Sequence, residues 1–161
     1  MSFSEKLSHV DEHGKVHMVN VGDKIPTHRH AVAEARVWLP PVVFEKLKDN
    51  ELHGPKGPVF HVAIIAGIMA AKKTGELIPL CHPLGLDQVS IDISVEDDEL
   101  VISCTASLHG KTGVEMEALT GVSIAALTVY DMCKAMSPDI VIRQIQLMEK
   151  TGGKNDFRRK A

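Results

Sequence analysis

The residues with the strongest potential for catalysis lie in one long, mostly uncharged segment. Asp131 and Lys134 are three positions apart, so they share a face of any helix that includes them. Apart from Asp131, residues 118–133 carry no charge, and this pattern favours a partly buried pair. Partial burial would shift both pKa values and make Lys134 a candidate general acid or base. The alternative is an ordinary surface ion pair, which contributes little to stability.

Glu117 and Asp131 belong to the same predicted helix but lie near its opposite ends. Fourteen positions separate them, which returns Glu117 to nearly the same helix face, whereas Glu115 lies on roughly the opposite side. At about 1.5 Å per residue, the two carboxylates are about 21 Å apart along the axis. One small substrate would not reach both within a single chain. A symmetric oligomer that pairs one end of this helix with the other end of a neighbour's would solve the problem.

A histidine-containing loop is a second candidate site. Leu80, Cys81 and His82 lie between Pro79 and Pro83, so their backbone is stiff. A preorganised histidine suits substrate orientation or proton transfer. An equally supported alternative is a turn whose histidine only caps or packs. Cys81 is interpreted as a small buried side chain rather than a nucleophile, because nothing in the sequence marks it as a thiolate.

Three lysines lie beside glycines in a way that suits phosphate binding. Lys56, Lys111 and Lys150 each lie in or next to a glycine-containing segment, where backbone amides and an ammonium group can meet phosphate oxygens. None has the spacing of a Walker A motif, and single Gly-Lys pairs are common in ordinary loops. Arg29, between two histidines, could add a guanidinium contact, or it could be a solvated turn residue.

Composition limits the classes of partner. The 161 residues, 44% apolar and 24% charged, fit one domain with a sizeable core. Aromatic residues make up only 4% and the net charge is −3, so nucleic-acid binding is not expected. The longest apolar stretch, residues 59–71, is too short to span a bilayer, and we expect neither a signal peptide nor a membrane partner.

The cysteines indicate the compartment. Cys81, Cys104 and Cys133 have no CxxC spacing and are expected to be free thiols in a reducing cytoplasm. The same lack of ligand spacing disfavours zinc, although the adjacent Cys81 and His82 keep a metal site open. Because the ligand spacing is missing, we predict no protein-bound metal.

The apolar pattern predicts the elements that must position these groups. Alternation predicts strands at 31–39, 87–95, 100–108 and 139–148. Helices are predicted at 42–48, 58–73 and 112–136, and loops at 51–57 and 96–99. The ends are expected to be an edge arm with a short strand (1–28) and a basic, partly mobile tail (151–161). This order is the split βαβ pattern of a ferredoxin-like α+β domain, with helices on one face of an antiparallel sheet.

Two long motifs resemble signatures of the MoaC family. The sequence reads GIMAAKKT at 67–74 and LIPLCHPL at 77–84, then GKTGVEMEALT at 110–120 and AALTVYDMCK at 125–134. The resemblance extends from about residue 17 to residue 154, nearly the whole chain. It implies a ferredoxin-like fold and a lyase of molybdenum cofactor biosynthesis. Such an enzyme converts the cyclised dihydroguanosine triphosphate made from GTP to cyclic pyranopterin monophosphate, with release of pyrophosphate.

The resemblance also implies roles for individual residues and an assembly. It implies that Asp131 is the catalytic acid–base residue and Lys134 its partner, in a homohexamer of three dimers whose active sites lie at dimer interfaces. The resemblance further implies no cofactor, with magnesium on the substrate triphosphate left open. The substrate-binding residues that it implies are Leu80, Cys81, His82, Glu115, Met116, Glu117, Lys56, Lys150 and Arg29.

Two departures and two alternatives accompany this resemblance. The family usually has aspartate at the position of Asn20 and arginine at the position of Ile64, which places a local salt bridge or interface contact in question.

One alternative function is a ligand-binding module without catalysis, because fold does not determine function. The other is a metal-dependent enzyme that uses Cys81, His82 and further histidines.

Overall fold

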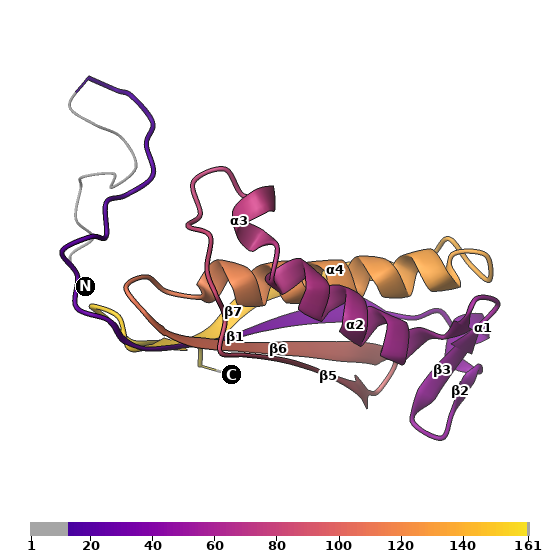
Figure 1. Ribbon diagram of the computed structural model, residues 1–161. Coiled ribbons are helices and arrows are strands. Elements are labelled where there is room, and N and C mark those ends of the chain that lie inside the picture. The colour runs from indigo at the N-terminus through magenta and orange to yellow at the C-terminus, as the bar shows by residue number, and fades with distance from the viewer. Residues whose placement is uncertain (1–12, 161) are drawn as a thin grey trace.

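The computed structural model describes residues 13–160, which form a sheet with helices on one face (Figure 1). The sheet is antiparallel with strand order β5-β6-β1-β7-β8. Its strands are β1 (Thr27–Trp38), β5 (Gln88–Glu96), β6 (Glu99–Gly110), β7 (Val141–Thr151) and β8 (Phe157–Arg158). The helices are α1 (Pro41–Phe44), α2 (Val59–Ala71), α3 (Thr74–Leu77) and α4 (Glu115–Cys133). A small second sheet contains β2 (Leu47–Lys48), β3 (Glu51–Gly54) and β4 (Gly57–Pro58).

The main sheet has the ferredoxin-like arrangement that the sequence predicts. Its long strands and helices follow the order β1-α2-β5-β6-α4-β7, and β1 lies between β6 and β7 at the centre of the sheet. Two strand–helix–strand units therefore share one sheet, with α2 and α4 side by side on the same face (Figure 1). The α+β class and the ferredoxin-like topology are confirmed. Among residues 13–160, no helix is both long enough and apolar enough to cross a membrane.

Small residues determine how closely the two long helices approach each other and the sheet. On β1, Ala31, Ala33 and Ala35 point toward the helices and have no exposed surface. Gly67 of α2 faces α4: a Cβ atom there would lie 2.7 Å from the carbonyl oxygen of Gly121. A larger residue at this crossing would force the helices apart. The close packing fixes the position of α4, whose two ends carry most of the candidate site residues.

The sequence prediction was wrong for residues 42–57. The predicted helix at 42–48 is only the single turn α1, and the predicted loop at 51–57 contains β3. Asp49 and Asn50 have φ angles of 51° and 58°, the left-handed conformation of a tight two-residue hairpin turn. This turn pairs β2 with β3. Smaller differences occur elsewhere: β7 extends to Thr151, three residues beyond the predicted end at 148.

Glu51 on β3 caps the N-terminus of α2. Pro58 occupies the N-cap position, and its side chain accepts no hydrogen bond. The Glu51 carboxylate instead accepts hydrogen bonds from the backbone N–H groups of Phe60 (2.7 Å), His61 (3.3 Å) and Leu52 (2.8 Å), and contacts the His61 ring. Burial favours a higher pKa for Glu51, but these hydrogen bonds outweigh it and lower the pKa. The cap joins α2 to the strand that precedes Lys56.

Removing this cap should weaken the fold measurably. Glu51→Ala leaves three N–H groups without their acceptor, so we expect the free energy of unfolding to fall by roughly 2–3 kcal/mol. Glu51→Gln keeps one acceptor oxygen and should lose about half as much. Urea denaturation of the two variants and the wild-type protein measures both values. A loss below about 0.5 kcal/mol for the alanine variant would contradict the capping role.

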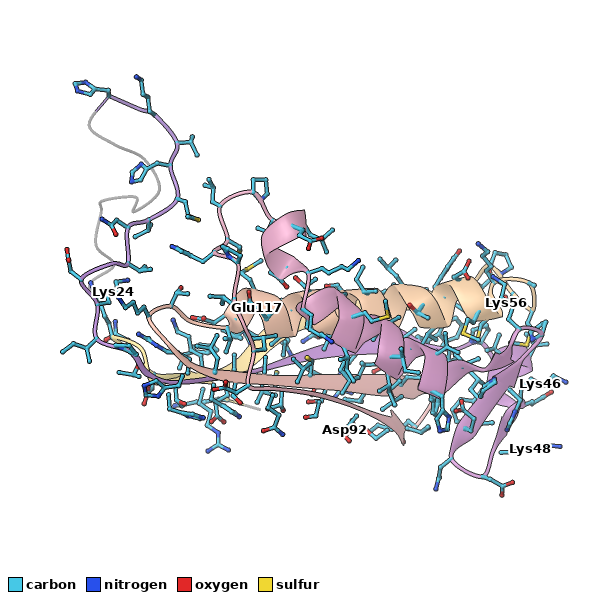
Figure 2. All side chains as sticks on the ribbon, viewed as in Figure 1. Lys24, Lys46, Lys48, Lys56, Asp92 and Glu117 are labelled. Atoms are coloured by element: carbon cyan, nitrogen blue, oxygen red, sulfur yellow. The ribbon has the colours of Figure 1, made fainter. Side chains whose placement is uncertain are left out.

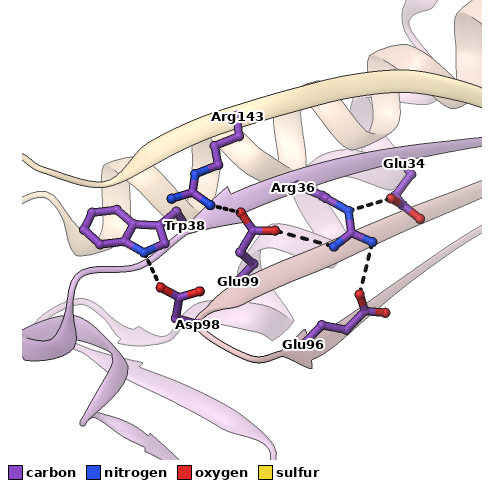
Figure 3. Close-up of polar contacts among 7 residues, drawn as sticks. All are labelled: Glu34, Arg36, Trp38, Glu96, Asp98, Glu99 and Arg143. Carbon is purple, nitrogen blue, oxygen red and sulfur yellow. Dashed lines mark hydrogen bonds and ion pairs between the residues drawn. The ribbon is translucent and has the colours of Figure 1, made fainter.

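The face of the sheet away from the helices carries a network of ion pairs (Figure 3). The Arg36 guanidinium contacts three carboxylates, those of Glu34 (3.1 Å), Glu96 (3.0 Å) and Glu99 (3.5 Å). Arg143 binds Glu99 at 2.5 Å, and its guanidinium carbon lies 5.6 Å from the centroid of the Trp38 ring. Trp38 donates a hydrogen bond to Asp98. The network joins β1, β5, β6 and β7 at the end of the sheet where β1 finishes.

Candidate active site

A cavity of about 530 Å³ opens at the N-terminal end of α4. Its walls include the first turn of α4, the loop at 78–86 and part of the segment that precedes β1. Val19, Val21 and Leu84 provide apolar walls, and Lys24 and Lys154 provide cations. The cavity brings together six residues from two distant motifs: Leu80, Cys81, His82, Glu115, Met116 and Glu117. A pocket of this kind suits a flat, mostly apolar ring with polar edges.

Glu117 is the buried acid of this cavity. It is only 3% exposed. Burial is the main cause that raises the pKa of Glu117 to about 7; its own backbone N–H opposes this shift, and the charge of Glu115 adds to it. Glu117 is therefore divided between its neutral and ionised forms near neutral pH. A carboxyl group in this condition can bind N–H groups of a ligand or exchange a proton with it.

The pH dependence of stability tests the raised pKa. The unfolded chain has the ordinary glutamate pKa of 4.5, so the folded protein binds the Glu117 proton more tightly and loses stability as pH rises from about 4.5 to about 7. Glu117→Gln is neutral at every pH, so at pH 8 it should unfold with roughly 2–3 kcal/mol more free energy than the wild type. Most of this difference should vanish at pH 5.

Glu115→Gln provides the matched control for this comparison. Glu115 is paired with Lys150 at 3.0 Å and its side chain is 29% exposed, so its replacement should give no gain in stability at pH 8. Denaturant titrations at both pH values measure the differences. Equal stability of Glu117→Gln and the wild type at pH 8 would show that Glu117 is not a destabilising buried charge.

A second cavity of about 700 Å³ adjoins the first and is rich in cations. The two cavities share Lys24, Thr112, Gly113, Glu115 and Lys154, so they form one cleft. Three further cations line the second cavity: Arg29, Lys111 and Lys150. Glu115 is the acidic residue in its lining. Five cations around one acid make this half of the cleft suitable for a ligand with several negative charges.

Gly152 allows the cations of β1 and the C-terminal segment to meet. Its φ angle is 81°, and a Cβ atom at this position would lie 1.8 Å from the backbone oxygen of His28. Only glycine permits this close approach. As a result Lys150 and Lys154, on either side of the turn, line the same cavity as Arg29. The position of Arg29 is further fixed by a hydrogen bond from its Nε to the carbonyl oxygen of Gly110 (3.4 Å).

The C-terminal end of α4 carries a separate cluster of charges. The Asp131 carboxylate contacts Lys134 Nζ at 2.7 Å and Lys56 Nζ at 2.7 Å. All three side chains are about half exposed in the single chain. The hydrogen bond from Lys134 is the largest cause that lowers the pKa of Asp131 to about 2, followed by the hydrogen bond from Lys56. Asp131 is therefore ionised and in turn raises the pKa of Lys134.

The predicted site residues thus fall into two groups at opposite ends of α4. Figure 2 shows Glu117 and Lys24 toward one end of the molecule and Lys56 at the other. Eight predicted residues, including Arg29 and Lys150, lie in the cleft, whereas Asp131, Lys134 and Lys56 form the distant cluster. Glu117 and Asp131 both lie on α4, so at about 1.5 Å per residue they are about 21 Å apart along its axis, as the sequence predicts.

Some residues of the cleft were not among the predicted site residues. Lys24, Val19 and Val21 come from the segment before β1, which lies outside the two long motifs. Lys111 and Lys154 had only their glycine neighbours as a signal. Cys81 is a neutral thiol, because burial and the charge of Glu117 raise its pKa. Among residues 13–160, no group of three or more His, Cys, Asp or Glu side chains is arranged to hold a metal ion.

Fold and site together define a ferredoxin-like α+β protein with a cation-rich cleft at one end of its long helix. The model of the MoaC family matches residues 18–153, so the chain belongs to the MoaC family. It is 51% identical over 149 residues to a protein from Novosphingobium aromaticivorans named cyclic pyranopterin monophosphate synthase. This match covers 92% of the chain and 94% of the relative. The predicted family membership is confirmed.

The structure accounts for the two departures from the expected family pattern. The side-chain oxygen of Asn20 accepts a hydrogen bond from the backbone N–H of Gly22 (2.8 Å). An aspartate would present the same acceptor, so the local turn does not need the charge. Ile64 is partly buried and packs against the core. In the single chain, Ile64 therefore contributes apolar packing where an arginine would bring a charge.

Proposed function

We propose that this chain is a cyclic pyranopterin monophosphate synthase of molybdenum cofactor biosynthesis. The substrate would be the cyclised dihydroguanosine triphosphate formed from GTP, and the products cyclic pyranopterin monophosphate and pyrophosphate. The observation that carries the proposal is the divided cleft, in which a pocket with a buried carboxyl group adjoins five cations. The relative of the same name, matched over nearly its full length, supports the same assignment.

The two halves of the cleft match the two halves of the proposed substrate. The purine-derived ring would lie in the first cavity, where Glu117 can accept hydrogen bonds from its N–H groups. The triphosphate would lie in the second cavity among Lys24, Arg29, Lys111 and Lys150. Formation of the cyclic phosphate expels pyrophosphate, and fixed cations stabilise the charge that develops on this leaving group.

The distant cluster would supply the remaining proton transfers. In the single chain, Lys56 and Lys134 neutralise Asp131 and keep its pKa low. A triphosphate offers both lysines another anion, so its arrival would relax this effect and make Asp131 a stronger base. Lys134 would then lie beside the phosphates as a proton donor. His82, in the first cavity, would exchange protons at the ring.

A second copy of the chain would bring the cluster to the cleft. The outer surfaces of α2 and α4 expose Ile65 (59%), Met69 (53%) and Leu127 (53%). Helix α2 is almost wholly apolar in sequence, and a helix that is apolar on all sides is normally covered on all sides. We infer that this surface packs against its equivalent in a two-fold dimer, which places the C-terminal end of one α4 near the N-terminal end of its partner's.

Further parts of the proposal concern assembly, compartment and metal. The family resemblance favours a homohexamer of three such dimers. The free thiols of Cys81, Cys104 and Cys133 favour the reducing environment of the cytoplasm. The reaction as proposed uses cations of the protein rather than a bound cofactor, and magnesium carried by the triphosphate is compatible with it.

The direct test supplies the cyclised dihydroguanosine triphosphate to the purified full-length protein. Appearance of pyrophosphate and cyclic pyranopterin monophosphate in equal amounts is the expected result. Binding without turnover would favour a ligand-binding module instead. Turnover that is abolished by a chelator in magnesium-free buffer, and restored by zinc alone, would favour a metal enzyme based on Cys81 and His82.

A further inference from the structure

The segment before β1 makes two hydrogen bonds to residues of the cleft. We call residues 16–26 the N-terminal arm; it extends beyond the N-terminal end of α4 (Figures 1 and 2). The carbonyl oxygen of Val19 lies 2.8 Å from Nε2 of His82, and Lys111 Nζ donates to the carbonyl oxygen of Gly22 at 2.5 Å. Val19 itself lines the first cavity. The arm is thus both a wall of the cleft and a partner of two cleft residues.

The arm has a defined internal shape that presents these carbonyl groups. Asn20 accepts a hydrogen bond from the backbone N–H of Gly22 (2.8 Å), and the backbone N–H of Lys24 donates to the oxygen of Val21 (3.2 Å). At the base of the arm, the Thr27 hydroxyl donates to the carbonyl oxygen of Gly152 at 2.7 Å. The first two bonds turn the chain within the arm. The third attaches the base of the arm to the glycine turn that follows β7.

The bond to Val19 determines which nitrogen of His82 carries the proton. A carbonyl oxygen can only accept, so Nε2 must be protonated. In the neutral ring, Nδ1 is then the nitrogen with a free lone pair. The backbone of His82 packs closely against Gly75, because a Cβ atom on that glycine would lie 3.1 Å from the His82 oxygen, tighter than an ordinary contact. The hydrogen bond to Val19 therefore orients the ring of a residue that lines the first cavity.

We propose that the N-terminal arm is a positioning element, and that the carbonyl group of Val19 holds His82 in the tautomer whose Nδ1 accepts a proton from the substrate. This inference rests on the proposed function. Nδ1 would take the proton to form an imidazolium ion that donates at both nitrogens, and would return it later to the ring system. Lys111 also holds the arm, by its hydrogen bond to the carbonyl oxygen of Gly22, so two cleft residues anchor the arm.

Two replacements of His82 separate the bond to the arm from proton transfer. The side-chain amide of His82→Gln places an N–H donor near the position of Nε2 but offers no basic nitrogen. The shorter side chain of His82→Asn does not reach Val19. We expect trypsin to cut the arm after Lys24 at similar rates in His82→Gln and the wild type. In His82→Asn, which lacks the hydrogen bond to Val19, cleavage should be about fivefold faster, the ratio that corresponds to the free energy of one neutral hydrogen bond.

Turnover provides the second readout. Both variants should lose at least about 100-fold in kcat, because neither side chain can act as the base. Cleavage of the arm in His82→Asn at the wild-type rate would overturn the positioning role of Val19. Wild-type turnover by His82→Gln would overturn the assignment of Nδ1 as the proton acceptor.

A third measurement uses the wild-type protein and does not depend on the folding of a variant. In wild-type protein labelled with nitrogen-15 histidine, long-range ring spectra show which nitrogen is protonated, and a neutral His82 protonated at Nδ1 would overturn the proposal. Cleavage and tautomer are measured without substrate. They therefore stay informative even if the wild-type protein fails to convert the cyclised triphosphate, a result that would count against the proposed function alone.

Discussion

Replacement of Asp131 by asparagine should lower kcat by at least about 100-fold, the loss typical of a general acid–base group. The asparagine keeps the size of the side chain but cannot take a proton, and it leaves Lys56 and Lys134 without their carboxylate partner. Lys134→Ala should cause a loss of the same order, because it removes the proposed proton donor. Steady-state release of pyrophosphate measures both effects.

Asp92→Asn is the matched control for Asp131→Asn. Asp92 is an exposed residue of β5, and the same change of charge there should leave kcat within about twofold of the wild type. Near-normal rates in both Asp131→Asn and Lys134→Ala would remove these residues from catalysis. The cluster would then be an exposed surface ion pair that contributes little to stability.

The fold could be predicted from the sequence wherever a strong period extends over many residues. The alternation on β1 and the long apolar segment of α4 lead directly to the ferredoxin-like arrangement. The region 42–57 could not be predicted in the same way, because its strands contain only two to four residues. Its hairpin depends on the left-handed conformation of Asp49 and Asn50, which no apolar period reveals. The capping role of Glu51 likewise exists only once β3 lies against α2.

The grouping of the candidate residues was predictable to the extent that they lie in long motifs. Residues of the two central motifs, such as His82 and Glu117, line the same cavity. The contact between Lys56 and Asp131 joins residues 75 positions apart, and nothing in the spacing of either residue points to the other. Lys24 belongs to a polar segment without periodicity, and only the folded path of the N-terminal arm brings it to the cleft.

Mixing of Asp131→Asn with Glu117→Gln, each of which we expect to be nearly inactive alone, tests whether active sites are shared between subunits. Asp131→Asn damages the C-terminal end of α4, and Glu117→Gln damages the N-terminal end. If each site takes one end of α4 from each subunit, a mixed dimer contains one site with both residues intact and one with both replaced. Random reassociation places half of the subunits in mixed dimers, so about a quarter of the wild-type activity should return.

The control mixes Asp131→Asn with Lys134→Ala, whose replacements lie at the same end of α4. Every site in such a mixture lacks either the carboxylate or the ammonium group, so no activity should return. Recovery in the first mixture and none in the second requires that Glu117 of one subunit and Asp131 of another act on one substrate. No recovery in either mixture, from variants that reassociate normally, would contradict the shared site, because Glu117 and Asp131 would then not act together on one substrate. Within a single subunit the helix holds the two carboxylates roughly 21 Å apart, so one small substrate reaches both only when they come from different subunits.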